Sequence, residues 1–305
     1  MRSSFELRWE LEMAVVNTNV NASVAQNALV RNERSMNTAM ERLSTGQRIN
    51  SASDDAAGLA IASRMTSQIK GLEAGVRNAN DAISMISVAD GALIEVGNML
   101  QRMRELALQS ANGTATSDDR DYLNAEYENL ITEIERIAQN TQWNGKTILT
   151  GDADTTDDST VAFQVGANGG QTITVDFGDI SQSGAATFTQ FELSAHAGSE
   201  SHISGSTTTV AQAHITGVLT YIDSAITSVN SQRATYGAAV NQLTYAVDNL
   251  SNVKVNSEAA RSRIADTDYA QETSELARTQ IIQQAGTAML AQANQLPQTV
   301  LSLLQ

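Results

Sequence analysis

The sequence contains no cysteine, one proline and few aromatic residues, and each scarcity narrows the class of protein. Without cysteine the chain can form no disulfide framework and no thiolate nucleophile or metal ligand. Aromatic residues make up 4% of the chain and hydrophobic residues 41%, so the apolar content consists mainly of Ala, Val, Ile, Leu and Met. Such a composition, with proline only at position 297, is typical of a helical protein.

Positive charge is also scarce, which bears on the partners of the chain. Asp and Glu outnumber Lys and Arg by 34 to 19, and the formal net charge is -15. Nucleic acids and anionic membrane surfaces attract clusters of Lys and Arg, so we expect neither as the main partner. Residues 1–12 carry scattered charges and no apolar run, so we also expect no cleaved secretory signal peptide.

The last 27 residues, Thr279 to Gln305, carry no charge at all. A chain terminus is normally polar and solvated, whereas this one is suited to burial. It does not fit a membrane span, because eight Gln and Asn side chains would need hydrogen-bond partners inside the hydrocarbon. We therefore expect no membrane insertion. We expect the tail to fray in the isolated chain and to become buried by self-association.

Apolar residues recur every three or four positions in two long segments, which predicts two long helices with narrow apolar stripes. The first stripe runs from Ile61 to Met103 and is interrupted at Asp90, and the second runs from Leu219 to Leu250 and is interrupted at Arg233. Stripes this narrow need partner helices. A shorter helix over residues 122–137, beginning near Ser117, would complete a bundle, and packing inside a monomer is the simplest alternative to assembly.

The outer segments, residues 20–45 and 275–305, carry stripes of the same spacing and are expected to pair with each other. In the second segment the stripe follows Ile282, Ala285, Met289 and Leu296. The residues that we expect to mediate polymerisation are Leu29, Met36, Met40, Leu43, Ile282, Met289, Leu296, Leu301 and Leu304. The predicted fold class is therefore mainly α, a long discontinuous helical bundle and coiled coil built from both chain ends, with a small β-rich insert in the middle.

Residues 151–210 form this insert and differ in composition from the rest. They are rich in Gly, Thr, Ser and Asp, and alternation over residues 161–165 and 172–177 predicts two short strands around a glycine-rich turn at 167–170. No Lys or Arg occurs between Lys146 and Arg233. We expect a small, acidic, exposed module.

Patterns that could carry chemistry are weak. Gly145-Lys-Thr147 resembles the end of a phosphate-binding loop but lacks its upstream glycine. The acidic run at 152–158 has the alternation of a calcium loop without its glycine or its final glutamate. The three histidines, His196, His202 and His214, have spacings that suit no metal pair. We expect no enzyme activity, no cofactor and no metal site.

Four segments of the sequence closely resemble bacterial flagellin. They are STGQRINSASDDAAGLAI at 44–61, RNANDAIS at 77–84, RSRIAD at 261–266 and QAGTAMLAQANQLPQTVLSLL at 284–304. The resemblance covers about residues 13–150 and 211–305. It implies a structural subunit that polymerises into the extracellular flagellar filament for motility. It also implies export through the flagellar type III apparatus and contact with an export chaperone, the filament cap and hook-junction proteins.

The resemblance further implies a division into domains. Residues 13–56 and 264–305 would form the terminal coiled coil that lines the filament channel, and residues 57–150 and 211–263 would form the surrounding helical tube. Residues 151–210 would face outward, and residues 1–12 are an extension. Because the family's usual start resembles the sequence from Met13, we expect Met13 to be the first residue of the native chain.

Residues 101–109, QRMRELALQ, resemble the flagellin segment that is read by the flagellin-sensing Toll-like receptor of animals. The contacts that carry over are Arg102, Leu106 and, on the next helix, Glu126. The same surface packs between subunits in the family's filaments, so we expect recognition of the monomer but not of the filament.

Two alternatives remain open at this point. A hook-filament junction protein shares the terminal helices of flagellin. A cell-surface protein on a flagellin scaffold could instead use the acidic insert to bind a glycan or a cation.

Overall fold

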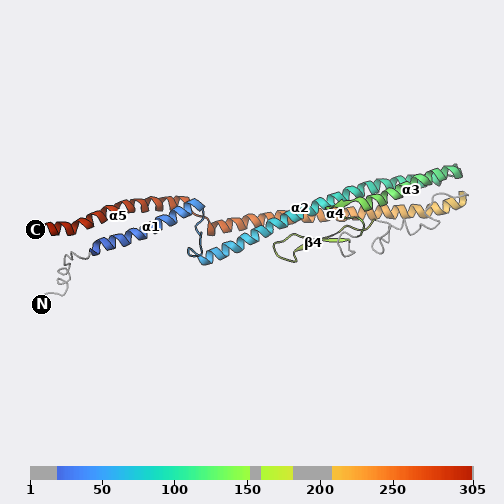
Figure 1. Cartoon of the computed structure of the whole chain (residues 1–305). Helices are drawn as coiled ribbons and strands as arrows, with labels where there is room; N and C mark the ends of the chain where they lie inside the picture. The colour runs from blue at the N-terminus through green and yellow to red at the C-terminus, as the bar shows by residue number, and fades with distance from the viewer. Residues whose placement is uncertain (1–18, 152–158, 181–207, 304–305) are drawn as a thin grey trace, which may run out of the picture. The chain divides into compact units, whose positions relative to one another are not determined.

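The computed structural model describes residues 19–151, 159–180 and 208–303, with the backbone alone at 208–215 and 296–303. Within these residues the chain is mainly α-helical, which confirms the predicted fold class (Figure 1). The helices are α1 (Val20–Thr45), α2 (Ala56–Ser110), α3 (Ser117–Asn140), α4 (Thr208–Ala265) and α5 (Tyr269–Leu303). The strands are β1 (Gln142–Trp143), β2 (Lys146–Thr147), β3 (Thr160–Gln164) and β4 (Thr172–Asp176).

The chain divides into two compact units. The terminal unit comprises the described residues up to Thr66 and from Ser257 onward, and the central unit comprises those between Ser67 and Asn256. The terminal unit thus contains α1, α5, the first turns of α2 and the last turns of α4. The domain boundaries expected from the sequence are a finer division and stay a prediction.

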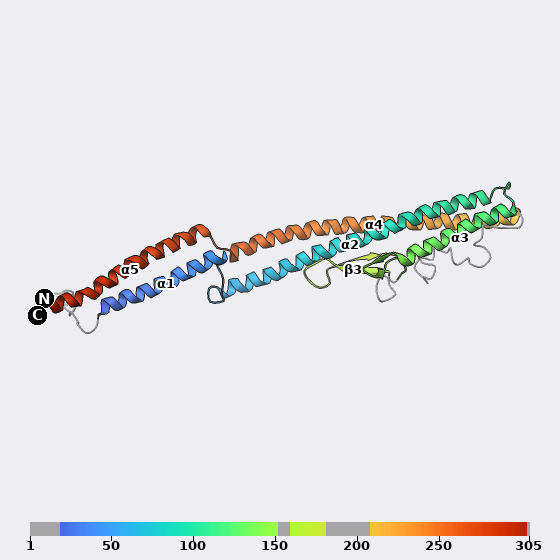
Figure 2. The same ribbon diagram turned by 45° about the horizontal axis from the view of Figure 1, so that its top comes forward.

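The central unit is built around one apolar core. Along α2 most of the stripe predicted from the sequence is buried between Ile69 and Met103, although Ile61 at its start is 39% exposed, and α3 and α4 run beside it (Figure 2). The largest side chains with less than 2% exposure are Tyr127, Tyr236, Phe177, Ile86, Leu93, Leu100, Met103, Leu106, Ile148 and Leu149. The two charges that interrupt the predicted stripes lie opposite each other, because Arg233 Nε donates to Asp90 Oδ1 at 2.8 Å. The interruptions are therefore a cross-helix ion pair.

By length and composition alone, α2 could also cross a membrane. Its most apolar window of 18 residues has a mean hydropathy of 1.3, and 33% of that window is buried inside the fold. A helix that supplies the core of a bundle passes the same test, so this property is weak evidence for a membrane span.

The start of α3 is fixed by a reciprocal pair of hydrogen bonds. The Asp119 backbone N–H donates to Thr116 Oγ1 at 3.2 Å, and the Thr116 backbone N–H donates to Asp119 Oδ2 at 3.0 Å. This capping box satisfies two N–H groups that a helix end would otherwise leave unpaired. Just inside the helix, the buried Arg120 donates from Nε to the Ser110 carbonyl at the end of α2, at 3.1 Å. The predicted third helix is thus confirmed, although it is longer than expected.

Two antiparallel hairpins follow α3. β1 and β2 pair across a turn in which Asn144 and Gly145 have φ of 51° and 81°, so Lys146 lies in a tight hairpin and not in a phosphate-binding loop. β3 and β4 pair from Thr160 opposite Asp176 to Gln164 opposite Thr172, which confirms both predicted strands.

The β3–β4 hairpin packs closely against α2. The Asn78 side chain donates from Nδ2 to the Gln164 carbonyl at 2.9 Å. A Cβ atom at Gly75 would lie 2.6 Å from the Val165 carbonyl oxygen, so the backbone approach requires glycine at this position.

In the terminal unit, α1 and α5 run side by side in antiparallel directions (Figure 1). The segments that connect them to α2 and α4 bond to each other: the Arg48 N–H donates to the Ala265 carbonyl at 2.7 Å, and the Thr267 N–H donates to the Gly46 carbonyl at 3.1 Å. Gly46 ends α1 with φ of 71°, the left-handed conformation that glycine adopts without strain. The uncharged tail is helical as far as Leu303, and its fraying in the single chain stays a prediction.

Candidate functional site

The pairing of α1 with α5 has an inner face, which we call the inner seam. On α5 the more protected positions recur every three or four residues and are Glu272, Leu276, Thr279, Gln283, Gly286, Leu290 and Ala293. On α1 they are Asn19, Ala22, Ala25, Leu29, Asn32, Met36, Ala39 and Leu43. The spacing is that of a coiled coil, but most of these side chains are small or polar.

The apolar stripe that the sequence analysis assigned to α5 lies outside the inner seam. Ile282 is 40% exposed and Met289 is 65% exposed, and Ala285 between them is exposed as well. The expectation that this stripe pairs with α1 is therefore wrong. It fails because apolar character was used to choose the buried face, whereas the seam of α5 is marked by spacing alone.

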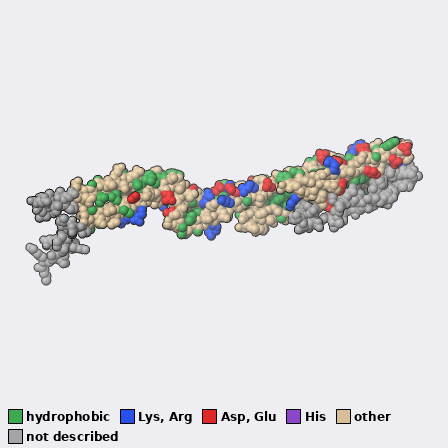
Figure 3. Space-filling view, viewed as in Figure 1, with side chains coloured by type: hydrophobic (Ala, Val, Ile, Leu, Met, Phe, Trp, Pro, Cys, Tyr) green, Lys and Arg blue, Asp and Glu red, His purple; other side chains and the backbone are tan. Residues whose placement is uncertain are grey.

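The exposed residues of α1 and α5 outside the inner seam, including this stripe, make up the surface that we call the outer face. Its large apolar members are Val20, Val24, Val30, Met40, Ile281, Ile282 and Met289, each between 40% and 66% exposed. Hydrophobic side chains are visible on the surface of the terminal helix pair in Figure 3. Exposed apolar residues gathered on one element commonly mark a contact with another protein.

The predicted polymerisation residues divide between these two faces. Leu29, Met36 and Leu43 are half-buried in the inner seam, whereas Met40, Ile282 and Met289 belong to the outer face. The side chains of Leu296 and Leu301, and the whole of Leu304, lie outside the described residues.

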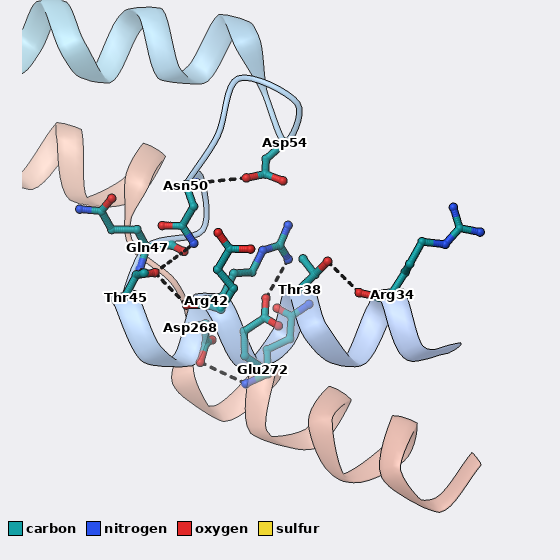
Figure 4. A network of polar contacts seen from close by, with 11 residues as sticks. Arg34, Thr38, Arg42, Thr45, Gln47, Asn50, Asp54, Asp268 and Glu272 are labelled. Carbon is teal, nitrogen blue, oxygen red and sulfur yellow. Dashed lines mark hydrogen bonds and ion pairs between the residues drawn. The ribbon is translucent and has the colours of Figure 1, made fainter. Parts of the chain in front are cut away.

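The inner seam also contains an ion pair beside a polar groove. Arg42 Nη1 lies 2.9 Å from Glu272 Oε1, and the Glu272 residue is only 8% exposed (Figure 4). The groove, of about 690 Å³, is lined by Ser35, Thr38, Ala39, Arg42, Gln271, Glu272, Ser274, Glu275 and Arg278. It offers hydroxyl groups and paired charges, but no nucleophile with a neighbouring base.

The Asp54 carboxylate closes the loop that follows α1. Its Oδ2 accepts hydrogen bonds from the backbone N–H groups of Ser51 at 2.9 Å and Asn50 at 3.1 Å (Figure 4). The Ser51 N–H lowers the pKa of Asp54 most, followed by the Asn50 N–H, because both stabilise the charged form.

A second candidate site lies in the central unit, where α2 and α3 meet. Arg102 Nη2 lies 2.8 Å from Glu126 Oε1, and Arg102 Nη1 lies 3.1 Å from Glu105 Oε2. Hydrogen bonds to Glu126, and then to Glu105, raise the pKa of Arg102. Both side chains of the Arg102–Glu126 pair are about half exposed, at 48% and 47%, so the pair is accessible from solvent.

Comparison with known proteins identifies the family. Residues 16–154 match the bacterial flagellin N-terminal helical region, and residues 219–304 match the bacterial flagellin C-terminal helical region. The flagellin of Halalkalibacterium halodurans is 43% identical over 292 residues, which covers 95% of this chain and all of that one. The chain belongs to the bacterial flagellin family.

A longer flagellin and a solved structure extend the comparison. Flagellin A of Vibrio cholerae is 37% identical over an alignment of 380 residues, covering 95% of this chain and 99% of that protein. The alignment is longer than this chain, so that flagellin contains residues with no counterpart here. A structure described as a flagellar hook-associated protein from Vibrio parahaemolyticus shares the fold, with 16% identity, a TM-score of 0.55, and coverage of 70% of this chain and all of that one.

Membership of the flagellin family establishes the general role. The chain is a structural subunit of the flagellar filament, an extracellular bacterial appendage, and flagellins are not enzymes. Within the described residues, no group of three or more His, Asp or Glu side chains could hold a metal ion. The acidic run at 152–158, His196, His202 and the side chain of His214 lie outside those residues.

Of the three receptor contacts carried over from other flagellins, the structure brings two together at the surface. Arg102 and Glu126 form the exposed pair, but Leu106 is 0% exposed and lies in the apolar core of the central unit. Leu108, two residues along α2, is 47% exposed. In this flagellin, then, Leu106 supports the surface from below and is not itself accessible.

Proposed function

We propose that the outer face of the terminal helix pair is the surface through which copies of this flagellin polymerise. The observation that carries the proposal is the exposure of large apolar side chains on a helix pair whose inner seam consists mostly of small or polar side chains. Ile281, Ile282 and Met289 keep 40% to 66% of their surface exposed despite the intramolecular pairing. Their removal from water requires a second copy, at about 25 cal/mol per Å² of apolar area buried.

Elongation from filament seeds tests this proposal. In the double variant Ile282→Ser and Met289→Ser, we expect elongation at least ten times slower than in the parent, with the same helix content by circular dichroism. The matched control is Gln280→Ser with Gln284→Ser, which alters two exposed polar positions on the same helix. Normal elongation of the apolar variant, or an equal loss in the control, would contradict the proposal.

We also propose that the monomer is recognised by the flagellin-sensing Toll-like receptor through Arg102 and Glu126. Support comes from the half-exposed guanidinium and carboxylate, which present a donor and an acceptor side by side on adjacent helices. Leu106 belongs to the proposal only as the buried residue that holds this part of α2 in place.

A reporter-cell assay on monomers separates the roles of these residues. We expect Arg102→Ala to lower signalling at least ten-fold, whereas Arg136→Ala, which removes another exposed arginine paired with Glu133, leaves signalling unchanged. Leu106→Ala should reduce signalling only to the extent that it unfolds α2. Equal signalling by Arg102→Ala and the parent would contradict the proposed role of Arg102 in receptor recognition.

The proposed export and assembly partners follow from family membership. We propose that the chain is exported through the flagellar type III apparatus without a cleaved signal. Its proposed partners are an export chaperone, the filament cap and the hook-junction proteins. Residues 181–207 of the insert, where a glycan-binding role would be sought, lie outside the described residues. Deletion of residues 151–210 distinguishes a filament subunit from a glycan-binding surface protein, because a filament subunit should still polymerise without the insert.

A further inference from the structure

The inner seam poses a specificity problem for the terminal helix pair. Of its seven positions on α5, only Leu276 and Leu290 carry large apolar side chains, and on α1 three of the eight positions are alanine. Small side chains present nearly the same surface after a shift of one helical turn. Apolar packing alone therefore discriminates weakly between neighbouring registers, a problem that coiled coils solve with a polar residue in the seam.

One apolar contact does depend on the register. A Cβ atom at Gly286 would lie 2.6 Å from Leu29 Cδ2, so Leu29 sits directly over the glycine. This single contact accounts for one position of a seam that extends over more than 20 residues of each helix.

The polar contacts of the seam agree on one register, and two of them, Asn32–Gln283 and Arg42–Glu272, join specific side chains. Asn19 donates from Nδ2 to the Ala293 carbonyl at 2.8 Å, and Arg42 pairs with Glu272 at 2.9 Å near the other end. Between them, Asn32 donates from Nδ2 to the Thr279 carbonyl at 2.8 Å and to Gln283 Oε1 at 3.2 Å. As the α1 partner advances along the chain, the α5 partner moves back, as one antiparallel register requires.

Asn32 lies at the centre of this arrangement and places both amide hydrogens of its side chain on α5. A shift of α5 by one turn would carry Gln283 Oε1 away from Asn32, whereas another backbone carbonyl of α5 could replace that of Thr279. The same shift would separate Arg42 from Glu272 and leave that carboxylate, at 8% exposure, without its cation. The polar contacts thus penalise a shifted register, whereas the small apolar residues tolerate it.

We propose that Asn32 is a specificity-determining residue that fixes the register of α1 on α5, with Arg42–Glu272 as a second determinant. The consequence for assembly rests on the proposed function of the outer face. A shift of one turn moves the α5 part of that face by about 5.4 Å relative to the α1 part. Copies can then match each other only if every copy holds the same register.

The absence of cysteine makes a direct test possible in the full chain. Spin labels are attached at Asn27→Cys and Ala277→Cys, two exposed positions offset along the helix axis. We expect one label-to-label distance in the parent and, in Asn32→Leu, a second population displaced by about 5 Å. Asn37→Leu is the matched control: it makes the same change at an exposed position of α1 and should keep the single distance.

Three outcomes decide the proposal. A second distance in Asn32→Leu but not in Asn37→Leu supports it, together with seeded elongation at least ten times slower in Asn32→Leu. A single distance in Asn32→Leu overturns it, as does an equal change in the control. If Asn32→Leu loses helix content, Asn32→Ala, which removes the donors without adding bulk, is measured and judged by the same outcomes.

Elongation of the Ile282→Ser and Met289→Ser variant distinguishes failure of this inference from failure of the proposed function. Normal elongation of that variant contradicts the outer face as the assembly surface. The label distances are measured in the monomer and report on the register independently of assembly.

Discussion

The two units use the same three-and-four spacing with different side chains, and only in the central unit does that spacing bury large apolar residues. In the central unit the spacing places Leu93, Leu100 and Met103 at 0% exposure. Among the described residues of the terminal unit, the buried apolar residues are Ala39, Ile49 and Ala62. Spacing predicts which positions face a partner helix, but the size of the side chains decides how much stability that partner supplies.

The ion pairs of the two units also differ in where they lie. Arg104–Asp223, Arg233–Asp90 and Lys254–Glu73 connect α2 with α4 at the solvent-exposed rim, with every side chain at least 30% exposed. Such pairs contribute about 0 to 1 kcal/mol each. Arg42–Glu272 lies within a seam, where it selects one arrangement over others. These three cross-helix pairs are therefore peripheral in the central unit, whereas Arg42–Glu272 is part of the interface in the terminal unit.

The largest expected effect is loss of core volume in the central unit. Leu100→Ala should lower the free energy of unfolding by about 2 to 5 kcal/mol, because Leu100 is completely buried and its truncation leaves a cavity. The half-buried seam residue Leu29, truncated in the same way, should cost less. Chemical denaturation followed by circular dichroism measures both. Equal losses would show that the terminal unit has a core of comparable strength.

A smaller effect is expected at the polar end of the same core. The Tyr236 hydroxyl donates to the Phe177 carbonyl at 2.7 Å, and both residues are almost completely buried. Tyr236→Phe keeps the ring but leaves this carbonyl unpaired, so we expect a loss of about 1 to 3 kcal/mol in the free energy of unfolding. Tyr245→Phe, at a residue 75% exposed on the same helix, is the control and should stay within about 0.5 kcal/mol of the parent.

Much of the central unit could be predicted from sequence, because large apolar residues mark its buried faces directly. The long helices, the third helix and the β3–β4 hairpin all appeared as patterns of spacing or alternation. Asp90 and Arg233 could be seen only as interruptions, since their partnership joins positions 143 residues apart.

The terminal unit was harder to predict for a physical reason. Its seam on α5 includes Thr279, Gln283 and Gly286, which no apolar pattern selects, while the apolar pattern of Ile282 and Met289 lies on exposed surface. Similarly, Leu106 was predicted to be a receptor contact but also has the spacing of a core residue, and it is 0% exposed.

The smallest expected effect is a loss of local stability at acidic pH. It compares the loop at Asp54 in the terminal unit with the start of α3 at Asp119 in the central unit. Hydrogen bonds from Thr116 lower the pKa of Asp119, as the Ser51 and Asn50 N–H groups lower that of Asp54. A carboxylate whose pKa is lowered by folding stabilises the fold above its ordinary pKa, and this contribution is lost as the pH falls through the lowered value.

Amide exchange measured from about pH 6 to about pH 2, corrected for intrinsic rates, should therefore show protection falling below about pH 4 at both loops. In Asp119→Asn the start of α3 should already be less protected at neutral pH and should change little on acidification, while the loop at Asp54 behaves as in the parent. In Asp54→Asn the loop at Asp54 should be less protected at neutral pH and change little on acidification, while the start of α3 behaves as in the parent. Loss of protection at both loops in either variant would mean that the two units open together. Local opening would then not distinguish the central unit from the terminal unit.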